Sequence, residues 1–219
     1  MRQKIKNQYF TTEFNNFFKD LAGNNHKEWF HANKKRYEQH VKNPFYDFLA
    51  ALIREIQKHD SSVQVEPKDC VSRINRDIRF AKDKTPYNLH LTAFISSGGR
   101  KDKSIPGIFL RFSPEMLGIM IGAFGPNKEQ LASIRASIIK QQSKFSEILN
   151  NTDFVDKFGT IKGDKMKRVP KDLVADVAKE PLILHKQYYF LAEKDPNLIK
   201  SEKLLAEVME YWHTGWPVN

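Results

Sequence analysis

The sequence predicts an α+β fold, with a single domain in which N-terminal and C-terminal helices pack on an antiparallel sheet of about four to five strands. Apolar residues recur every three to four positions over residues 10–60 and again over 126–160, which indicates helices. Residues 70–123 instead favour strands, and their short connections imply antiparallel pairing. The remaining part, 161–219, is expected to form a loop, a short strand and a terminal helix. This order is typical of α+β rather than alternating α/β proteins.

Three helices are expected in the N-terminal third of the chain. Either Thr11 or Thr12 supplies a side-chain oxygen that can cap the first helix. Asn25, followed three residues later by Glu28, is a variant of the capping box and predicts the start of the second helix. Asn43 is expected to cap the third, because a proline follows it at the first helical position.

Strands are expected at 88–97, 105–113, 117–123 and 187–194, and the segment from Val71 to Phe80 can also be extended. The terminal helix is predicted within 197–212. No linker rich in glycine, proline or serine divides the chain, so we expect one domain over residues 1–219.

The 219-residue chain holds 36 Lys and Arg residues against 26 Asp and Glu residues, a formal net charge of +10. This surplus favours acidic partners, although it can also serve solubility alone. Cys70 is the one cysteine, which excludes an internal disulfide and a cysteine-rich zinc site. The histidines show neither HxH nor HExxH spacing. We therefore predict no metal site, and no cofactor is indicated.

No run of the chain approaches the roughly 20 apolar residues that cross a bilayer. The first 18 residues begin basic and lack the apolar stretch of a signal peptide. The sequence therefore predicts a cytoplasmic protein that does not act at a membrane, and it leaves the oligomeric state open.

The stretch SRINRDIRFAKDKTPYNLH, from Ser72 to His90, concentrates three arginines, two lysines and two aspartates where the helical pattern gives way to strands. Arginine keeps its charge when partly buried and can grip a phosphate or carboxylate with two parallel hydrogen bonds. Because isolated exposed ion pairs contribute little stability, we expect the arginines to form an anion-binding site. The loop around Pro86 would place further side chains at its edge.

The predicted pocket is formed by Arg73, Arg76, Arg79 and Lys84, with Asp77 orienting the arginines and Tyr87 lining the site. The full set of predicted ligand-binding residues is Trp29, Lys34, Arg73, Arg76, Asp77, Arg79, Asp83, Lys84 and Tyr87. If the protein is an enzyme, Asp77, Asp83 or His90 would handle the proton, and the sequence does not choose between them.

Three other interpretations stay open. The charged groups can form a lattice of surface ion pairs, with Asp77 paired to an arginine and Asp83 to a lysine. Dispersed basic loops such as GGRKDKS and KGDKMKRVPK can contact the phosphates of a nucleic acid. Finally, the charged face can dock an acidic protein.

Three motifs, NNHKEWF, RINRDIRFAKDKTPY and KMKRVPK, occur in this order and together resemble the bacterial and fungal family called domain of unknown function 2461. The resemblance runs from about Phe10 to near the C-terminus and implies no activity. After Pro170 the chain departs from the family pattern with KDLVAD. The family motif falls on Asn25, Trp29, Phe30, Arg73, Arg76, Asp77, Arg79, Phe80, Asp83, Lys84, Pro86, Tyr87, Lys167, Arg168 and Pro170.

Overall fold

The computed structural model describes residues 8–218 and confirms the α+β class. Its centre is a four-stranded antiparallel sheet in the order β1-β2-β3-β4. The strands are β1 (Leu91–Ile95), β2 (Gly107–Phe112), β3 (Leu117–Ala123) and β4 (Tyr188–Lys194). All four lie within or close to the predicted strand ranges. Residues 1–7, which begin the stretch judged too polar for a signal peptide, lie outside the described residues.

Helices precede, interrupt and follow the sheet. The N-terminal set is α1 (Thr12–Gly23), α2 (Lys27–Ala32), α3 (Lys34–Tyr37), the π-helical turn η1 (Glu38–Lys42), α4 (Asn43–Gln57) and α5 (Pro67–Cys70). The later set is α6 (Lys128–Lys140), α7 (Gln142–Leu149), α8 (Thr152–Phe158), α9 (Val174–Lys179) and α10 (Leu204–Gly215). A 3-10 turn precedes α10, so the predicted terminal helix starts later than its pattern suggested.

Two of the three predicted helix starts need correction. Thr11 caps α1 as expected, by accepting a hydrogen bond from the backbone of Glu13. The start of α2 is capped by His26 rather than Asn25, whose side chain is used elsewhere. Asn43 is not a cap, because α3, η1 and α4 form one continuous helical run and Asn43 has helical backbone angles within it.

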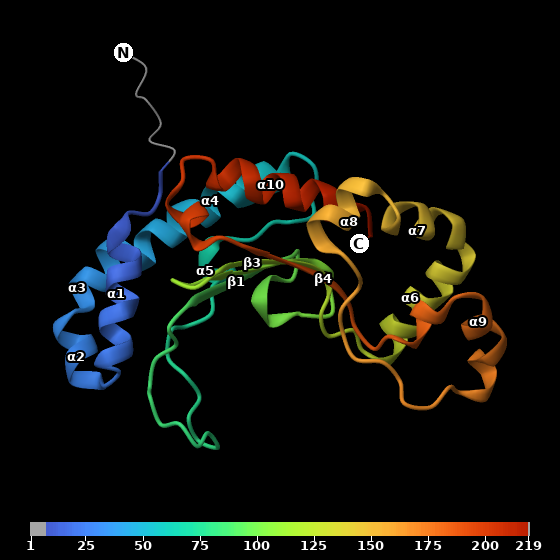
Figure 1. Cartoon of the computed structure of the whole chain (residues 1–219), viewed down its shortest axis with the longest axis horizontal. Coiled ribbons are helices and arrows are strands. Elements are labelled where there is room, and N and C mark those ends of the chain that lie inside the picture. The colour runs from blue at the N-terminus through green and yellow to red at the C-terminus, as the bar shows by residue number, and fades with distance from the viewer. Residues whose placement is uncertain (1–7, 219) are drawn as a thin grey trace, which may run out of the picture.

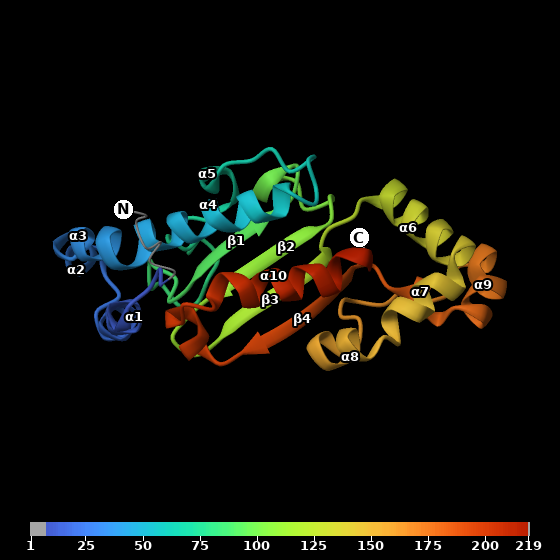
Figure 2. The same ribbon diagram turned by 90° about the horizontal axis from the view of Figure 1, so that it is seen from above.

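Figures 1 and 2 show the helices α4 and α10 lying across the same face of the sheet. The side chains between these layers form the main core. Phe112 of β2 is at its centre, with its ring 5.6 Å from that of Phe10, 5.1 Å from Phe45 and 5.3 Å from Phe48. No helix lies across the opposite face of the sheet in the part of the chain that is described (Figure 1). Burial of this aromatic layer holds the helices on the sheet.

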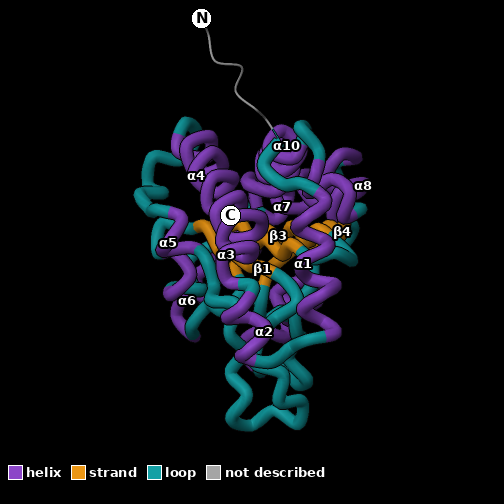
Figure 3. Tube along the Cα trace, turned by 90° about the vertical axis from the view of Figure 1, so that its left-hand side faces the viewer, coloured by secondary structure: helices purple, strands orange, loops and turns teal. Residues whose placement is uncertain are grey.

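The segment between α5 and β1 is a long loop rather than the extended strand predicted for Val71 to Phe80. It is tied to itself and to the sheet by isolated bridges, Val71 to Ala93 and Asn75 to Tyr87. Beyond these bridges it extends away from the sheet on the face that the helices leave uncovered (Figures 1 and 3). Pro86 has no backbone N–H to donate to a neighbouring strand. Side chains of this segment form hydrogen bonds with its backbone, in place of a regular ladder between strands.

The chain between β3 and β4 forms a lobe beside the sheet (Figure 2). It begins at α6, where Asn127 and Gln130 form a reciprocal capping box. The loop over 161–171 returns to β4 through bridges from Lys162 to Tyr189 and from Lys165 to His185. Within residues 8–218, no helix combines the length and apolar character needed to cross a membrane.

Candidate functional site

Arg76 and Arg79 are each held by a different aspartate, so they do not share one anion site. Arg79 donates to both carboxylate oxygens of Asp77 at 2.9 and 2.7 Å, and its side chain is 76% exposed. Arg76 pairs with Asp83 at 2.5 Å and also donates to the backbone oxygen of Thr85 at 3.0 Å. The predicted convergence of Arg73, Arg76, Arg79 and Lys84 on one point is therefore wrong.

The tip of the loop is closed by its own polar groups. The Lys84 ammonium donates to the backbone oxygen of Ile78 at 3.0 Å. Asp83 accepts from the backbone and hydroxyl of Thr85, both at 2.9 Å. These bonds and the Arg76 guanidinium lower the pKa of Asp83 to about 2. The expected ion-pair lattice is present in part, with Asp83 paired to an arginine rather than a lysine.

The two predicted aromatic ligand residues belong to the protein interior. Tyr87 is buried and stacks on Phe30, with ring centroids 4.1 Å apart. Trp29 is half-buried against Phe17 of α1, at 5.7 Å between rings. Asn25 holds Tyr87 in place by bonding both its backbone oxygen, at 2.9 Å, and its backbone nitrogen, at 3.1 Å.

None of the three candidates for proton transfer has the features of an activated acid or base. Hydrogen bonds from Arg79 lower the pKa of Asp77, so both aspartates are ionised and weakly basic at neutral pH. Burial, with a smaller effect of Arg111, lowers the pKa of His90. Burial also raises the pKa of the Cys70 thiol to about 12, which leaves it a poor nucleophile.

Arg73, unlike the other cations of the loop, faces a cavity of about 350 Å³. The predicted residue Lys34 lines the same cavity from α3. Three further basic residues complete its wall, and we call the whole the cationic cavity: Lys34, Lys42, Lys68, Arg73 and Arg100. They come from the α3–η1 run, α5, the start of the long loop and the 3-10 turn η2 (Gly99–Lys101). Segments distant in sequence thus surround one concentration of positive charge.

Most of this charge has no acidic partner. Within residues 8–218, Lys34, Lys42, Arg73 and Arg100 form no ion pair, whereas Lys68 pairs with Glu66 at 2.6 Å in solvent. The one acid among the residues that line the cavity is Glu38. Unneutralised cations lining a hollow repel one another, and an anion placed between them removes that repulsion.

The π-helical turn η1 supplies two of the lining residues, Glu38 at its start and Lys42 at its end. Such turns are rare inside helices and occur frequently at functional sites, because the wider turn redirects side chains. The floor between the charges includes Phe30, Tyr37 and Tyr46. Burial raises the pKa of Tyr37, so its hydroxyl keeps its proton over the physiological range.

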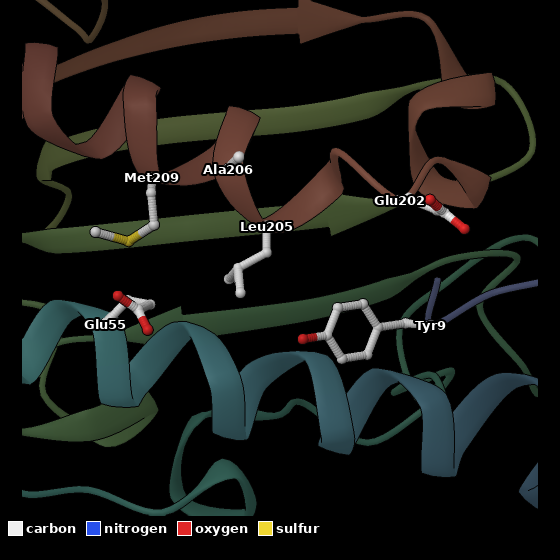
Figure 4. Close-up of a pocket in the computed structure, with 6 residues that line it drawn as sticks. All are labelled: Tyr9, Glu55, Glu202, Leu205, Ala206 and Met209. Atoms are coloured by element: carbon white, nitrogen blue, oxygen red, sulfur yellow. The ribbon is translucent and has the colours of Figure 1, made fainter. Parts of the chain in front are cut away.

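Two other cavities lack this charge. Figure 4 shows the one between α4 and α10, about 290 Å³, with Glu55 and Glu202 at opposite ends and Tyr9 and Leu205 between them. A cavity of about 440 Å³ beside α6 and α7 has a single basic lining residue, Lys144. An anion therefore has a clear electrostatic preference for the cationic cavity.

Lys42, Lys68 and Arg100 were missed because each looks like an ordinary surface cation in its own segment. Arg100 lies in GGRKDKS, which sequence reasoning singled out only as a nucleic-acid loop. For Lys42 the usable signal was its position eight residues after Lys34, a little over two turns along a helical run. No group of three His, Cys, Asp or Glu side chains suited to a metal ion is present among residues 8–218.

A family model described as "Conserved hypothetical protein (DUF2461)" matches residues 13–219, which is nearly the whole chain. Comparison with curated proteins found no match, and comparison with solved structures found none. The match covers both sides of the cationic cavity and the long loop. The chain therefore belongs to the DUF2461 family of conserved hypothetical proteins.

Proposed function

We propose that this protein binds a small anionic ligand, bearing phosphate or carboxylate groups, in the cationic cavity. The observation that carries the proposal is the convergence of four cations without acidic partners, from separate segments, on one hollow. Because Lys34, Arg73 and Arg100 are exposed, solvent screens their mutual repulsion, and the cluster has a modest cost in the absence of a ligand. Its cost is offset when an anion binds.

The chemistry of the wall fits a ligand with at least two anionic oxygens. The guanidinium groups of Arg73 and Arg100 offer planar pairs of donors, which suit bidentate contact with phosphate or carboxylate. Lys34 and Lys42 act as point charges. A volume of about 350 Å³ lies at the lower end of ordinary ligand pockets, about 300–1,000 Å³, and favours a metabolite over a polymer.

The same cavity offers contacts for the uncharged part of a ligand. Phe30, Tyr37 and Tyr46 provide apolar surface and hydroxyl groups, and Glu38 can accept a hydrogen bond from a ligand hydroxyl. Asp77, Asp83 and His90 do not line it. The proposal is therefore one of binding. We also propose a cytoplasmic location, which the single free cysteine, buried in the core, supports.

Thermal-shift measurements with matched pairs of ligands test this proposal. Pyrophosphate, sugar phosphates and di- or tricarboxylates are compared with their uncharged analogues. A ligand at 100 times its Kd adds about 2.7 kcal/mol, which corresponds to about 5–10 °C in a domain of this size. Only the charged member of a pair is expected to raise the Tm.

The control uses variants that remove equal charge. Arg73→Gln and Arg100→Gln should abolish most of the shift, whereas Arg79→Gln, which removes a cation held by Asp77, should leave it unchanged. An equal loss in all three variants would mean that net charge, and not the cavity, is responsible for the shift in Tm.

The affinity of the cavity for sulfate should be constant from pH 6 to 9, because no histidine lines the cavity.

A further inference from the structure

The face of the sheet turned away from the helices carries a connected group of aromatic side chains. Phe124 follows β3, and its ring lies 5.4 Å from Phe94, 6.1 Å from Phe109 and 5.3 Å from Tyr189. Phe94 is buried, and the other three are partly exposed. None of the four belongs to the core that holds the helices. We call this group the open-face aromatics.

Strand register explains why these residues gather there. Phe94 is paired with Phe109, and Phe109 with Met120, so one row of side chains crosses three strands on the same face. The adjacent row contains the exposed residue Arg111 and ends at Glu193, which is the acid of this row. The open face thus combines a partly exposed apolar row with a polar row.

Three loops on this side of the sheet account for most of the net positive charge of the protein. They are the tip of the long loop, 76–85, the connection 97–106 between β1 and β2, and the segment 162–171 that leads toward α9. Together these basic loops contain 12 Lys and Arg residues and 4 Asp and Glu residues, a net charge of +8, against +10 for the whole chain. Figure 1 shows all three on the side of the sheet opposite α4 and α10.

The tip of the long loop also presents an aromatic ring to solvent. Phe80 is 95% exposed, and the guanidinium of Arg79 lies 5.9 Å from the centre of its ring. The loop that carries it is fixed by the bonds of Arg76, Asp83 and Lys84 described above. A large apolar side chain held in solvent on a braced loop is typical of a contact residue rather than of a folding core.

We propose that the open face of the sheet, with the three basic loops at its borders, binds single-stranded nucleic acid. Exposed aromatic rings stack on bases of any sequence, and surrounding cations contact the phosphates. A charged loop alone would fit any polyanion, but the partly exposed rings of Phe109, Phe124 and Tyr189 favour a ligand with accessible planar groups. A duplex fits less well, because its bases are stacked on one another and their faces are not accessible to these rings. This proposal stands apart from the cationic cavity, which shares only Arg100 with the basic loops.

Fluorescence anisotropy of labelled 12-nucleotide oligouridine and oligothymidine tests the proposal. Both strands should bind at low salt, with an affinity that falls steeply as salt rises. A duplex of the same length and poly-glutamate serve as competitors, and both should compete at least tenfold less well than the unlabelled single strand. Equal competition by poly-glutamate would overturn the proposal in favour of an acidic protein partner. Equal competition by the duplex would overturn the proposal that the aromatic rings stack on the bases of a single strand.

Matched variants locate the site. The triple substitution Lys167→Gln, Arg168→Gln and Lys171→Gln should weaken binding at least tenfold and lower the salt slope by about two to three. The control triple, Arg54→Gln, Lys58→Gln and Lys203→Gln, removes the same charge from exposed positions in α4, at its end and at the start of α10. Figure 1 shows these two helices on the opposite side of the sheet, so the control should change affinity less than twofold. Equal effects of the two triples, or no binding by the unaltered chain at 50 mM salt, would overturn the proposal.

The aromatic contacts have their own test. Phe80→Ala removes a ring that makes no core contact, so folding is unaffected, and binding should weaken about fivefold or more. Phe109→Leu should act in the same direction, with its Tm measured to confirm that the fold is intact. If both variants bind the oligonucleotides as tightly as the unaltered chain, the stacking role is wrong.

Discussion

Asp83 fixes the shape of the long loop through hydrogen bonds that require its charged form. Its carboxylate accepts from Arg76 and from the backbone and hydroxyl of Thr85. These donors lower its pKa from an ordinary 3.8 to about 2, with the backbone bond as the largest cause. The residue that sequence reasoning proposed as a proton carrier is, in the structure, a brace for the loop.

The brace predicts a specific dependence on pH. Because the pKa of Asp83 is lower in the folded state, its stabilising effect is complete above about pH 4 and is lost as the pH falls toward 2. The Tm of the unaltered protein should therefore exceed that of Asp83→Asn by a constant margin above pH 5. Most of the margin should be lost by pH 2, where about half of the Asp83 carboxylates are protonated, and the rest should disappear below that pH. A margin independent of pH over this range would contradict the assignment.

Asn25 links α2 to the base of the long loop across 62 positions of sequence. Its amide both donates to and accepts from the backbone of Tyr87, as a neighbouring strand would. Tyr87 then stacks on Phe30, which lines the cationic cavity. One side chain thus connects the helical wall of the cavity to the loop wall that carries Arg73.

Removing this link should have a measurable cost. Asn25→Ala leaves two backbone groups of Tyr87 without partners in a partly buried place, which costs about 1–3 kcal/mol. Asn16→Ala removes an asparagine side chain from the exposed surface of α1 and should change stability by less than about 0.5 kcal/mol. Urea unfolding of both variants measures the difference. Equal stabilities would show that the link does not hold the two walls together.

Across the whole molecule, the charge distribution fits the proposed anion binding better than it fits a role in stability. The cationic cavity gathers charges from segments that the fold brings together, with Glu38 as the one acid among them. Clusters of like charge lower the stability of a free protein, and such costs are common at functional sites. Arg79, by contrast, has its own aspartate and carries no such cost.

Neutralising the cationic cavity should stabilise the free protein, because it removes repulsion between like charges. The double variant Arg73→Gln and Arg100→Gln should raise the free energy of unfolding by about 0.5–1 kcal/mol at low ionic strength. The gain should shrink in 1 M salt, where the Debye length falls to about 3 Å. Arg79→Gln should not raise the free energy of unfolding, because Arg79 is paired with Asp77. A double variant that is less stable at low salt would mean that these arginines are structural.

The sheet and most helices could be predicted because their signals are local. The apolar run of Gly107–Phe112 and the helical spacing of α1 are each contained in a short segment. The cavity could be predicted only in part, through Arg73 and Lys34. Arg76 was misplaced because its direction depends on Asp83 and Thr85 rather than on strand alternation. Arg100 was missed because its partners lie in distant segments.

Calorimetric titration with pyrophosphate measures whether the cationic cavity binds anions. Arg73→Gln should weaken binding by at least tenfold, the loss expected for one charge-assisted hydrogen bond, while Arg79→Gln should change it less than twofold. Pyrophosphate affinity that is the same in the unaltered chain and in Arg73→Gln would contradict this prediction.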